Sequence, residues 1–365
     1  MNKTIATPGN LAELQTLLRS EPLVLPVGNQ TKQPLANDDQ AQVVSLRGMT
    51  GILEYEPSEF TFTAFAGTTI AEVNETLQQR QQYLPFDPML VQAGATIGGA
   101  VGAGLSGPGR FRYGGLRDFL LGVKFLSGDG EVINSGGKVV KNAAGFDIPK
   151  LLVGSMGRLG VMVEMTFKVF PTPGRQQTLA VECGSVQDAL KRMAVAAASQ
   201  WELDAVDYRP GANTLFLRLA GPDKVNQMVI RKIMERWGTD VTELPDGDAH
   251  WRAVRELDWS DTTQAFAVKI PAHRQVVEAL AAWVGQNSRV DLHVSAAGAV
   301  AWLLCDARSD LDELDRILLE HEVAGLLVRG EGTRIGIGCW PSTEISVAVK
   351  QAMDPVSKFP HLFHT

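Results

Sequence analysis

The glycine distribution places the strongest constraint on what this chain can fold into. Of the 36 glycines in 365 residues, 18 fall in the 67 residues from Gly94 to Gly160. Glycine at that density weakens helices and strands alike, so it is retained where the backbone turns tightly or approaches another group closely. The region therefore predicts a binding site at which the main chain wraps a large ligand.

The length and composition predict a globular protein of two domains. A chain of 365 residues exceeds what one ordinary core can organise, and 45% hydrophobic residues suffice to bury two cores. The net charge of -7 and the pI near 5.5 argue against a nucleic-acid binder, which would normally carry a basic surface.

The cysteines and the N-terminus favour a reducing, cytoplasmic setting. Cys183, Cys305 and Cys339 lie far apart and form no CxxC pair, which excludes a four-cysteine zinc or iron–sulfur site within this chain. The N-terminal residues predict an amphipathic helix rather than a secretory signal. The uncharged stretch from Pro88 to Gly109 contains seven glycines and two prolines, so we do not expect it to span a membrane.

The chain predicts short strands and helices before a linker at Pro171–Gly174, where we place the domain boundary. Thr69 is the expected cap of a helix over 69–80. Strands are expected at 22–28, 41–46, 60–67 and 160–170.

The second half predicts an internal repeat of the order β-α-β-β-α-β, which is ferredoxin-like. The first unit has strands at 178–183, 203–208, 214–220 and 239–243, with helices at 185–200 and 222–237. The second has strands at 264–270, 290–296, 300–306 and 334–339, with helices at 271–286 and 308–321. Together they predict one antiparallel sheet covered by helices. All seven tryptophans lie in this half, and we expect them in core and interface packing.

One dinucleotide motif is misleading. "GAGLSG" at Gly102–Gly107 matches GxGxxG, but a Rossmann site needs a strand before it and a helix after it, and here glycine-rich chain precedes and "PGRFRYGG" follows. The sequence contains no GxxxxGK[ST], HExxH or GxSxG, so phosphoryl transfer, zinc hydrolysis and serine-hydrolase chemistry have no support.

Three other segments point to a diphosphate ligand. "PVGNQTK" (26–32) leaves a strand into a loop that can direct backbone N–H groups and the Thr31 hydroxyl at a pyrophosphate. "GATIGGAVGAGLSG" (94–107) lets backbone press against a flat ring system. From Pro108 to Arg158 there are eight Lys or Arg against four Asp or Glu, a local basic excess in an acidic protein. An ordinary loop-rich surface with incidental lysines is the alternative interpretation.

Taken in order, these segments resemble the FAD-binding family of the vanillyl-alcohol oxidase or PCMH type, and within it the FAD-binding subunits of glycolate oxidases. The resemblance rests on "GATIGGAVGAGLSGP", "RYGGLRDFLLGVKFLSGDGEV", "GGKVVKNAAGFDIPKLLVGSMGRLGVMVE" and "KVFPTPG". It implies an α+β protein with a PCMH-type FAD-binding domain of two α/β subdomains (1–172), a ferredoxin-like-repeat domain (175–350) and a C-terminal tail (351–365).

The resemblance also implies where FAD binds. The pyrophosphate would lie at the loop from Gly28 to Thr31, the segment from Thr96 to Gly102 would line the cofactor, and 157–161 would back its adenine half. Its motif positions in this chain are Gly28, Asn29, Gln30, Thr31, Thr96, Ile97, Gly98, Gly99, Gly102, Tyr113, Gly114, Asn142, Gly145, Asp147, Gly157, Gly160 and Val161. Lys141 and Arg112 are candidate cations beside the flavin, and no catalytic residue or metal ligand is assigned.

The chain departs from the family pattern at three places. Asn29 and Gln30 replace glycines of the phosphate loop, and Gln tolerates positive φ poorly. The flavin domain (1–172) contains no His or Cys, so we expect FAD to be noncovalent. The His-rich motif that binds metal and substrate in relatives is reduced to "DLHVSAAGAVAW", whose His293 we interpret as a structural residue.

The resemblance therefore implies an FAD-binding subunit of a multi-subunit glycolate oxidase, carrying a flavin for electron transfer. Its partners would be a catalytic flavoprotein subunit and an iron–sulfur subunit, in the cytoplasm or peripherally at the inner membrane face. Two alternatives stay open: a stand-alone FAD-dependent D-2-hydroxyacid dehydrogenase, and a flavin-free structural subunit of the complex.

Overall fold

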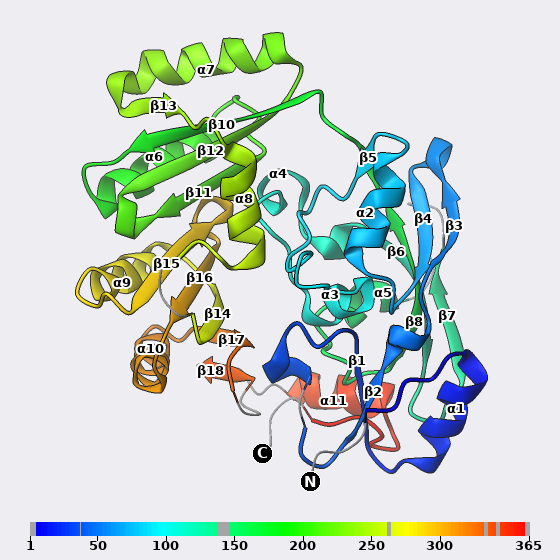
Figure 1. Ribbon diagram of the computed structural model, residues 1–365. Coiled ribbons are helices and arrows are strands. Elements are labelled where there is room, and N and C mark those ends of the chain that lie inside the picture. Colours follow the sequence, from blue (N-terminus) through cyan, green and yellow to red (C-terminus); the bar gives the residue numbers. More distant parts are fainter. Residues whose placement is uncertain are drawn as a thin grey trace. The chain divides into compact units, whose positions relative to one another are not determined.

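The computed structural model describes residues 5–36, 38–137, 146–260, 264–331, 335–340 and 344–361. The chain divides into two compact units (Figure 1). The first comprises Met1–Ser106, Gly115–Thr172 and Pro341–Thr365, and the second Gly107–Gly114 and Pro173–Trp340. This division differs from the expected domains in two places, because 107–114 joins the second unit and the C-terminal segment joins the first.

The first unit contains a small parallel pair of strands and a five-stranded antiparallel sheet of order β3-β4-β8-β6-β7. Its helices are α1 (Leu11–Ser20), α2 (Ile70–Gln78), α3 (Ile97–Ala103), α5 (Ile148–Leu152) and α11 (Glu344–Met353). Its strands are β1 (Val24–Val27), β2 (Gln42–Ser45), β3 (Ile52–Glu56), β4 (Thr61–Phe65), β5 (Gln82–Tyr83), β6 (Leu120–Leu126), β7 (Val132–Gly136), β8 (Val161–Lys168) and β9 (Phe170–Pro171).

Helix α2 begins where the sequence predicts. Thr69 accepts a hydrogen bond from the Glu72 N–H, while the Glu72 carboxylate accepts one from the Thr69 N–H at 2.9 Å. This reciprocal capping box satisfies two backbone donors that the first turn leaves open. Ile70, Val73 and Leu77 then recur at helical spacing and are buried.

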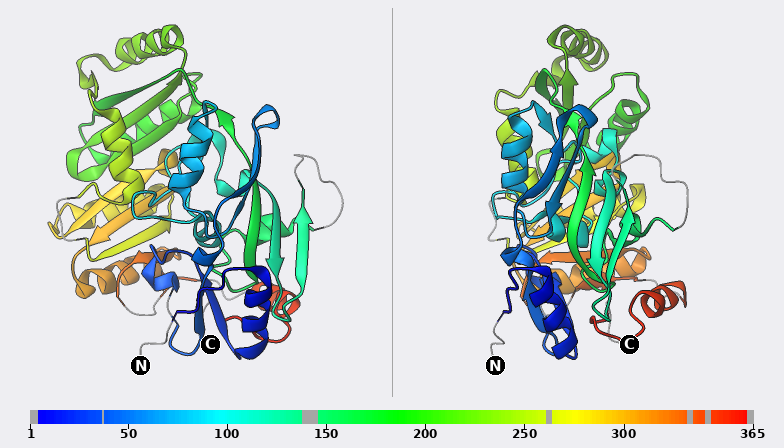
Figure 2. Two further views of the ribbon diagram at one scale, coloured as in Figure 1. Left: turned by 45° about the vertical axis from the view of Figure 1, so that its right-hand side comes forward. Right: turned by 90° about the vertical axis from the view of Figure 1, so that its right-hand side faces the viewer.

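Helix α11, drawn in red in Figures 1 and 2, belongs to the first unit, and Lys358 beyond it contacts the chain where α1 ends. The Lys358 ammonium donates to the Glu21 carbonyl at 2.6 Å, and the Val24 N–H donates to the Lys358 carbonyl at 2.8 Å. Lys350 forms an ion pair with buried Asp354, whose carboxylate also accepts the Lys358 N–H. The segment that the sequence suggests is a tail is therefore an integrated part of this unit.

The second unit is built on a nine-stranded antiparallel sheet of order β13-β10-β12-β11-β15-β16-β14-β17-β18. Its strands are β10 (Arg175–Glu182), β11 (Ala205–Arg209), β12 (Thr214–Gly221), β13 (Val241–Glu243), β14 (Phe266–Pro271), β15 (Val290–Ser295), β16 (Val300–Cys305), β17 (Ala324–Arg329) and β18 (Gly336–Gly338). Its helices are α4 (Arg110–Tyr113), α6 (Val186–Ala198), α7 (Asp223–Trp237), α8 (Gly247–Glu256), α9 (Arg274–Val284) and α10 (Arg308–Glu320).

The predicted repeat is present, with one correction. Strands β10 to β13 and β14 to β17 each follow the ferredoxin-like order, and the two halves meet where Tyr208 of β11 pairs with Val294 of β15. The fourth strand of the second repeat is β17, however, and the expected strand at 334–339 is the additional edge strand β18. The apolar run of β17, from Ala324 to Val328, is too short for periodicity to separate it from the end of a helix.

The two faces of this sheet are packed differently. Alternate strand residues such as Leu217 and Leu303 join residues of α6, α7, α9 and α10 in one large core. On the opposite face, Trp251 and Val254 of α8 pack against Ala205 and Phe216. This second face also carries buried polar side chains.

Candidate cofactor site

The first unit contains a pocket built largely from the segments that the sequence singles out. Its walls are the loop after β1, the first turns of α3 and the segment leading into β8. The space between them is about 670 Å³ including the open mouth. The predicted residues that line it are Gly28, Asn29, Gln30, Thr31, Thr96, Gly98, Gly99, Gly102, Gly157 and Gly160.

The loop after β1 is held in place by contacts with its neighbours. The Asn29 side-chain amide donates to the Gly94 carbonyl at 3.1 Å, and the Ser45 hydroxyl donates to the Gly28 carbonyl at 3.2 Å. Gln30 has a φ of 54°, in the left-handed region that Gln adopts at a cost. The replacement of a family glycine by Gln30 thus creates a strained backbone position in the pocket wall.

Lys32 is the charged member of the pocket lining that sequence reasoning missed. Its side chain is only 7% exposed, and its ammonium donates to the Thr31 hydroxyl at 2.9 Å. No carboxylate of the described residues forms an ion pair with it, and burial lowers its pKa to about 8. A buried cation without a protein counter-ion fits an anionic ligand. The lysine stands in the quoted loop, but no sequence signal showed that it is buried.

A second buried cation lies behind the wall. Arg158 donates to the Leu35 carbonyl at 3.2 Å and to the Met156 carbonyl, and both acceptor residues line the pocket. Burial lowers the pKa of Arg158 to about 10. The Arg158 carbonyl accepts a hydrogen bond from Lys350 at 2.8 Å, so the C-terminal segment supports this wall.

Most of the lining glycines are required by contacts within the chain. A Cβ on Gly28 would lie 2.1 Å from the Thr96 hydroxyl, and one on Gly98 would lie 2.8 Å from the Ala66 carbonyl oxygen. Gly157 would meet Pro26 at 2.8 Å and has a φ of 72°. Gly102 differs, because a Cβ there would meet only ordinary van der Waals contacts of 3.8 Å or more. Close backbone packing, rather than ligand approach alone, explains much of the glycine density.

The other predicted site residues lie elsewhere. Ile97 and Val161 are fully buried core residues, and Asp147 caps α5 and pairs with Lys150 at 3.0 Å. Tyr113 and Gly114 belong to the 107–114 segment of the second unit. Asn142 and Gly145, together with the candidate cation Lys141, lie outside the described residues.

The candidate cation Arg112 is engaged within the second unit. Its guanidinium donates to the Glu202 carbonyl at 2.6 Å and pairs with the Glu202 carboxylate at 3.1 Å. The GxGxxG match is also explained. Gly102 lies inside α3 and Gly104 ends that helix with a φ of 62°, so the motif marks a helix C-terminus rather than a strand-to-helix turn.

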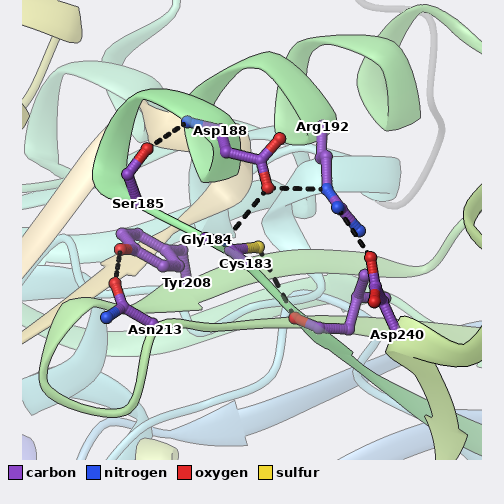
Figure 3. Close-up of polar contacts among 9 residues, drawn as sticks. Cys183, Gly184, Ser185, Asp188, Arg192, Tyr208, Asn213 and Asp240 are labelled. Atoms are coloured by element: carbon purple, nitrogen blue, oxygen red, sulfur yellow. Dashed lines mark hydrogen bonds and ion pairs between the residues drawn. The ribbon is translucent and has the colours of Figure 1, made fainter.

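Cys183 belongs to the second unit, at the start of α6. Figure 3 shows Arg192 between Asp188 and Asp240, with Nε–Oδ2 and Nη2–Oδ2 distances of 2.9 and 2.8 Å. Burial raises the pKa of the Cys183 thiol to about 11, so it stays protonated and unreactive.

Histidine placement changes one argument for a noncovalent flavin. The sequence interpretation considered residues 1–172 alone, but the C-terminal segment brings His361 into the first unit. His361 is exposed, and none of the described residues that line the pocket is a His or a Cys.

The described side chains and helices bear on metal binding and on membrane insertion. No group of three or more His, Cys, Asp or Glu side chains among them is placed to hold a metal ion. None of the described helices has the length and apolar character needed to cross a membrane.

One family of known proteins matches the N-terminal part of the chain. Residues 3–136 match the family described as FAD binding domain. This part of the chain is similar to an FAD-binding domain. The expectation of a PCMH-type FAD-binding domain, and of FAD as its cofactor, is thereby confirmed.

Two relatives with assigned functions resemble the chain. Glycolate oxidase subunit GlcE of Escherichia coli (strain K12) is 36% identical over 210 residues, covering 57% of this chain and 58% of that protein. Glycolate oxidase subunit GlcD of Bacillus subtilis (strain 168) is 31% identical over 137 residues, covering 38% and 29%. The alignments thus span less than two thirds of either relative's length.

A solved structure supports the fold. Alkyldihydroxyacetonephosphate synthase superposes with a TM-score of 0.70 over 97% of this chain and 76% of that one, at 15% sequence identity. At this identity the likeness concerns the fold alone, and the expected α+β class with a PCMH-type domain is confirmed.

Proposed function

We propose that this chain is an FAD-binding subunit of a multi-subunit glycolate oxidase, with its flavin serving electron transfer during oxidation of glycolate to glyoxylate. The observation that carries the proposal is the 36% identity to glycolate oxidase subunit GlcE, which extends over 210 residues. The partners in this proposal are a catalytic flavoprotein subunit and an iron–sulfur subunit. The complex would be cytoplasmic or peripheral at the inner membrane face.

The pocket of the first unit is the proposed FAD site. The residues of the Gly28–Lys32 loop would hold the pyrophosphate, the Thr96–Gly102 segment would line the cofactor, and Gly157 and Gly160 would back the adenine half. The buried ammonium of Lys32 supports this placement, because a pyrophosphate is the counter-ion that the described protein groups do not supply. Bound FAD would supply reversible two-electron transfer.

The chain's own residues would position and neutralise the cofactor. Lys32 and the Thr31 hydroxyl would form an anchor for phosphate oxygens, with Lys32 held charged by the anion it contacts. Leu46, Ala66 and Met162 would exclude water from the apolar part of the pocket. The absence of His and Cys from the described lining supports noncovalent attachment.

The test is an anaerobic absorption spectrum of the purified chain, recorded before and after addition of glycolate and again after addition of the partner subunits. We expect a flavin spectrum that stays oxidised with glycolate alone and bleaches only with the partners present.

Other outcomes would contradict the proposal. Bleaching by glycolate without partners would identify a stand-alone 2-hydroxyacid dehydrogenase. A colourless chain that added FAD does not restore would identify a flavin-free structural subunit.

A further inference from the structure

Helix α11 (red in Figure 2) is a largely apolar helix that the first unit leaves uncovered. None of its ten described residues is buried, and the first five, from Glu344 to Ala348, are all exposed. Ile345 is 74% and Val347 58% exposed. Apolar side chains gathered on one exposed element, rather than scattered singly over a surface, indicate an interaction site.

The contacts that hold α11 to the first unit lie at its C-terminal half. The Lys350 ammonium donates to the Arg158 carbonyl at 2.8 Å and to the Phe359 carbonyl at 2.9 Å. It also forms an ion pair with the buried carboxylate of Asp354, just beyond the helix. The polar side of α11 therefore faces the unit to which the helix belongs.

The side of α11 away from Lys350 carries an apolar stripe. Four residues recur at the spacing i, i+3, i+4 and i+7, which places them on one face of a helix: Ile345, Ala348, Val349 and Ala352. Ala348 and Ala352 are exposed, and Val349 is half-buried. This orientation is the reverse of that of an ordinary surface helix, which turns its apolar stripe towards its own core.

The sequence of α11 does not stabilise an uncovered helix. Isolated helices shorter than about 12–15 residues are marginal in water, because most helical stability in proteins comes from packing of the apolar face. Ile345, Val347 and Val349 are also β-branched and lose side-chain freedom in a helix. The helical conformation of this segment therefore needs packing beyond what its own unit supplies.

The positions of Ile345 and Val347 select the shape of the covering surface. Two residues apart in a helix of 3.6 residues per turn, they lie about 160° from one another around the axis. A flat surface, such as a membrane or the same helix of a second copy, covers only one of them. A groove covers both.

The charge of α11 selects a protein groove over lipid. Helices that lie on membranes carry several Lys or Arg on their polar face. Helix α11 contains one cation, Lys350, and that cation is paired with Asp354. The exposed stripe is uncharged, so an uncharged apolar surface is its complement.

We propose that α11 docks into an uncharged apolar groove of a partner subunit, in the mode by which an amphipathic helix presents anchors at i, i+3, i+4 and i+7. The inference rests on the proposed function, in which the partner is another subunit of the same complex. Docking buries Ile345 and Val347 and leaves the inward contacts of Lys350 in place.

The test is calorimetric binding of the purified full chain to the catalytic flavoprotein subunit and to the iron–sulfur subunit, each measured separately. Val347→Glu places a charge in the groove and should weaken binding to one of the two subunits roughly tenfold or more. Ile345→Glu should do the same, because the groove covers both residues. Val225→Glu is the matched control, since Val225 lies in the first turn of α7 and is 51% exposed. All three positions are exposed, so the melting temperatures should match that of the wild type.

The possible results separate this inference from the proposed function. A wild type that binds neither subunit overturns both. Wild-type binding that Val347→Glu and Val225→Glu weaken equally, or not at all, overturns the inference alone, and a loss in only one of Ile345→Glu and Val347→Glu identifies a flat contact and overturns the groove. Binding to phosphatidylglycerol–phosphatidylcholine vesicles, or self-association, that Val347→Glu abolishes assigns α11 to a membrane or to a second copy and also overturns it.

Hydrogen exchange of backbone amides gives a readout that needs no variant. The amides of α11 should exchange rapidly in the free chain and become protected in the complex. Helix α2, whose Ile70, Val73 and Leu77 are buried, should be protected in both states and serves as the internal control. Exchange in α11 that the bound subunit leaves unchanged would overturn the inference.

Discussion

Replacing Lys32 by Met tests the proposed cofactor site most directly, because it removes the charge and keeps most of the side-chain volume. Lys32 is 7% exposed, and its ammonium donates to the Thr31 hydroxyl at 2.9 Å. If the pyrophosphate lies against this pair, the substitution removes a charge-assisted hydrogen bond from the complex. In the free protein it removes a buried charge.

The effect of Lys32→Met on FAD affinity and its effect on the stability of the apoprotein have opposite signs and comparable size. Because burial lowers the pKa of Lys32 from 10.5 to about 8, holding its charge in the free pocket costs roughly 3 kcal/mol. A hydrogen bond to a charged group contributes about 1.5–3 kcal/mol, so Lys32→Met should weaken FAD binding roughly 10- to 100-fold. The apoprotein should be as stable as the wild type or more stable.

The assay is a titration of apoprotein with FAD, followed by flavin fluorescence, with thermal unfolding of the same samples. ADP contains the pyrophosphate and adenosine does not. Lys32→Met should therefore weaken the binding of ADP, as it does that of FAD, and leave the binding of adenosine unchanged. Lys269→Met is the matched control, because burial and Arg110 lower the pKa of Lys269 to about 8 but it does not line the pocket. Unchanged FAD affinity in Lys32→Met, or an equal loss in Lys269→Met, would refute the reasoning.

The same lysine predicts a pH dependence. FAD binding favours the charged form, so the dissociation constant should be level below about pH 8 and rise up to tenfold per pH unit above it. The folding stability of the apoprotein, in contrast to its FAD affinity, should rise with pH. The destabilisation is fully present below pH 8 and is relieved between pH 8 and 10.5, where the unfolded chain binds a proton that the folded chain has released. Neither trend should survive in Lys32→Met, and persistence of both would assign them to other groups.

Four further substitutions, one of them with a control variant, have defined outcomes. Gly102→Ala should fold normally but weaken FAD binding if the cofactor contacts this backbone. Gly98→Ala should lower the melting temperature, because its Cβ would lie 2.8 Å from the Ala66 carbonyl oxygen. Equal stability of the two variants would contradict this expectation. Thr69→Ala removes the cap of α2 and should cost about 1 kcal/mol in urea denaturation, with Thr76→Ala, at a partly exposed position of the same helix, as the control. Lys350→Met leaves the Asp354 carboxylate buried without its cation and should cost about 3–5 kcal/mol, whereas a loss below 1 kcal/mol would show that the pair is solvated.

The repeat in the second unit was predictable because its strands and helices differ clearly in hydrophobic period. Strands such as 214–220 alternate, and the 185–200 segment carries apolar residues at helical spacing. Helix α8 was missed, although Asp246 caps it, because its ten residues include only a short apolar face formed by Trp251 and Val254.

The unit boundaries were less predictable because they depend on tertiary contacts. Phe111 packs against the core of the second unit, and Lys350 and Asp354 fix the C-terminal segment to the first. Neither contact leaves a local pattern, since the partners lie far away in sequence. The buried contact of Asp207 with His293, at 2.8 Å between Oδ2 and Nε2, is hidden for the same reason.

The glycine-rich region shows how far a sequence argument about a ligand can extend. High glycine density indicates close approach of the backbone, but it does not reveal what approaches. At Gly28, Gly98 and Gly157 the neighbour is the chain itself, with a Cβ falling 2.1 to 2.8 Å from Thr96, Ala66 and Pro26. These glycines form the pocket by letting its walls pack closely, and the walls then hold a buried lysine with which no carboxylate of the described residues forms an ion pair. Ligand specificity in this site therefore depends more on the charge at Lys32 than on the glycines that first draw attention to it.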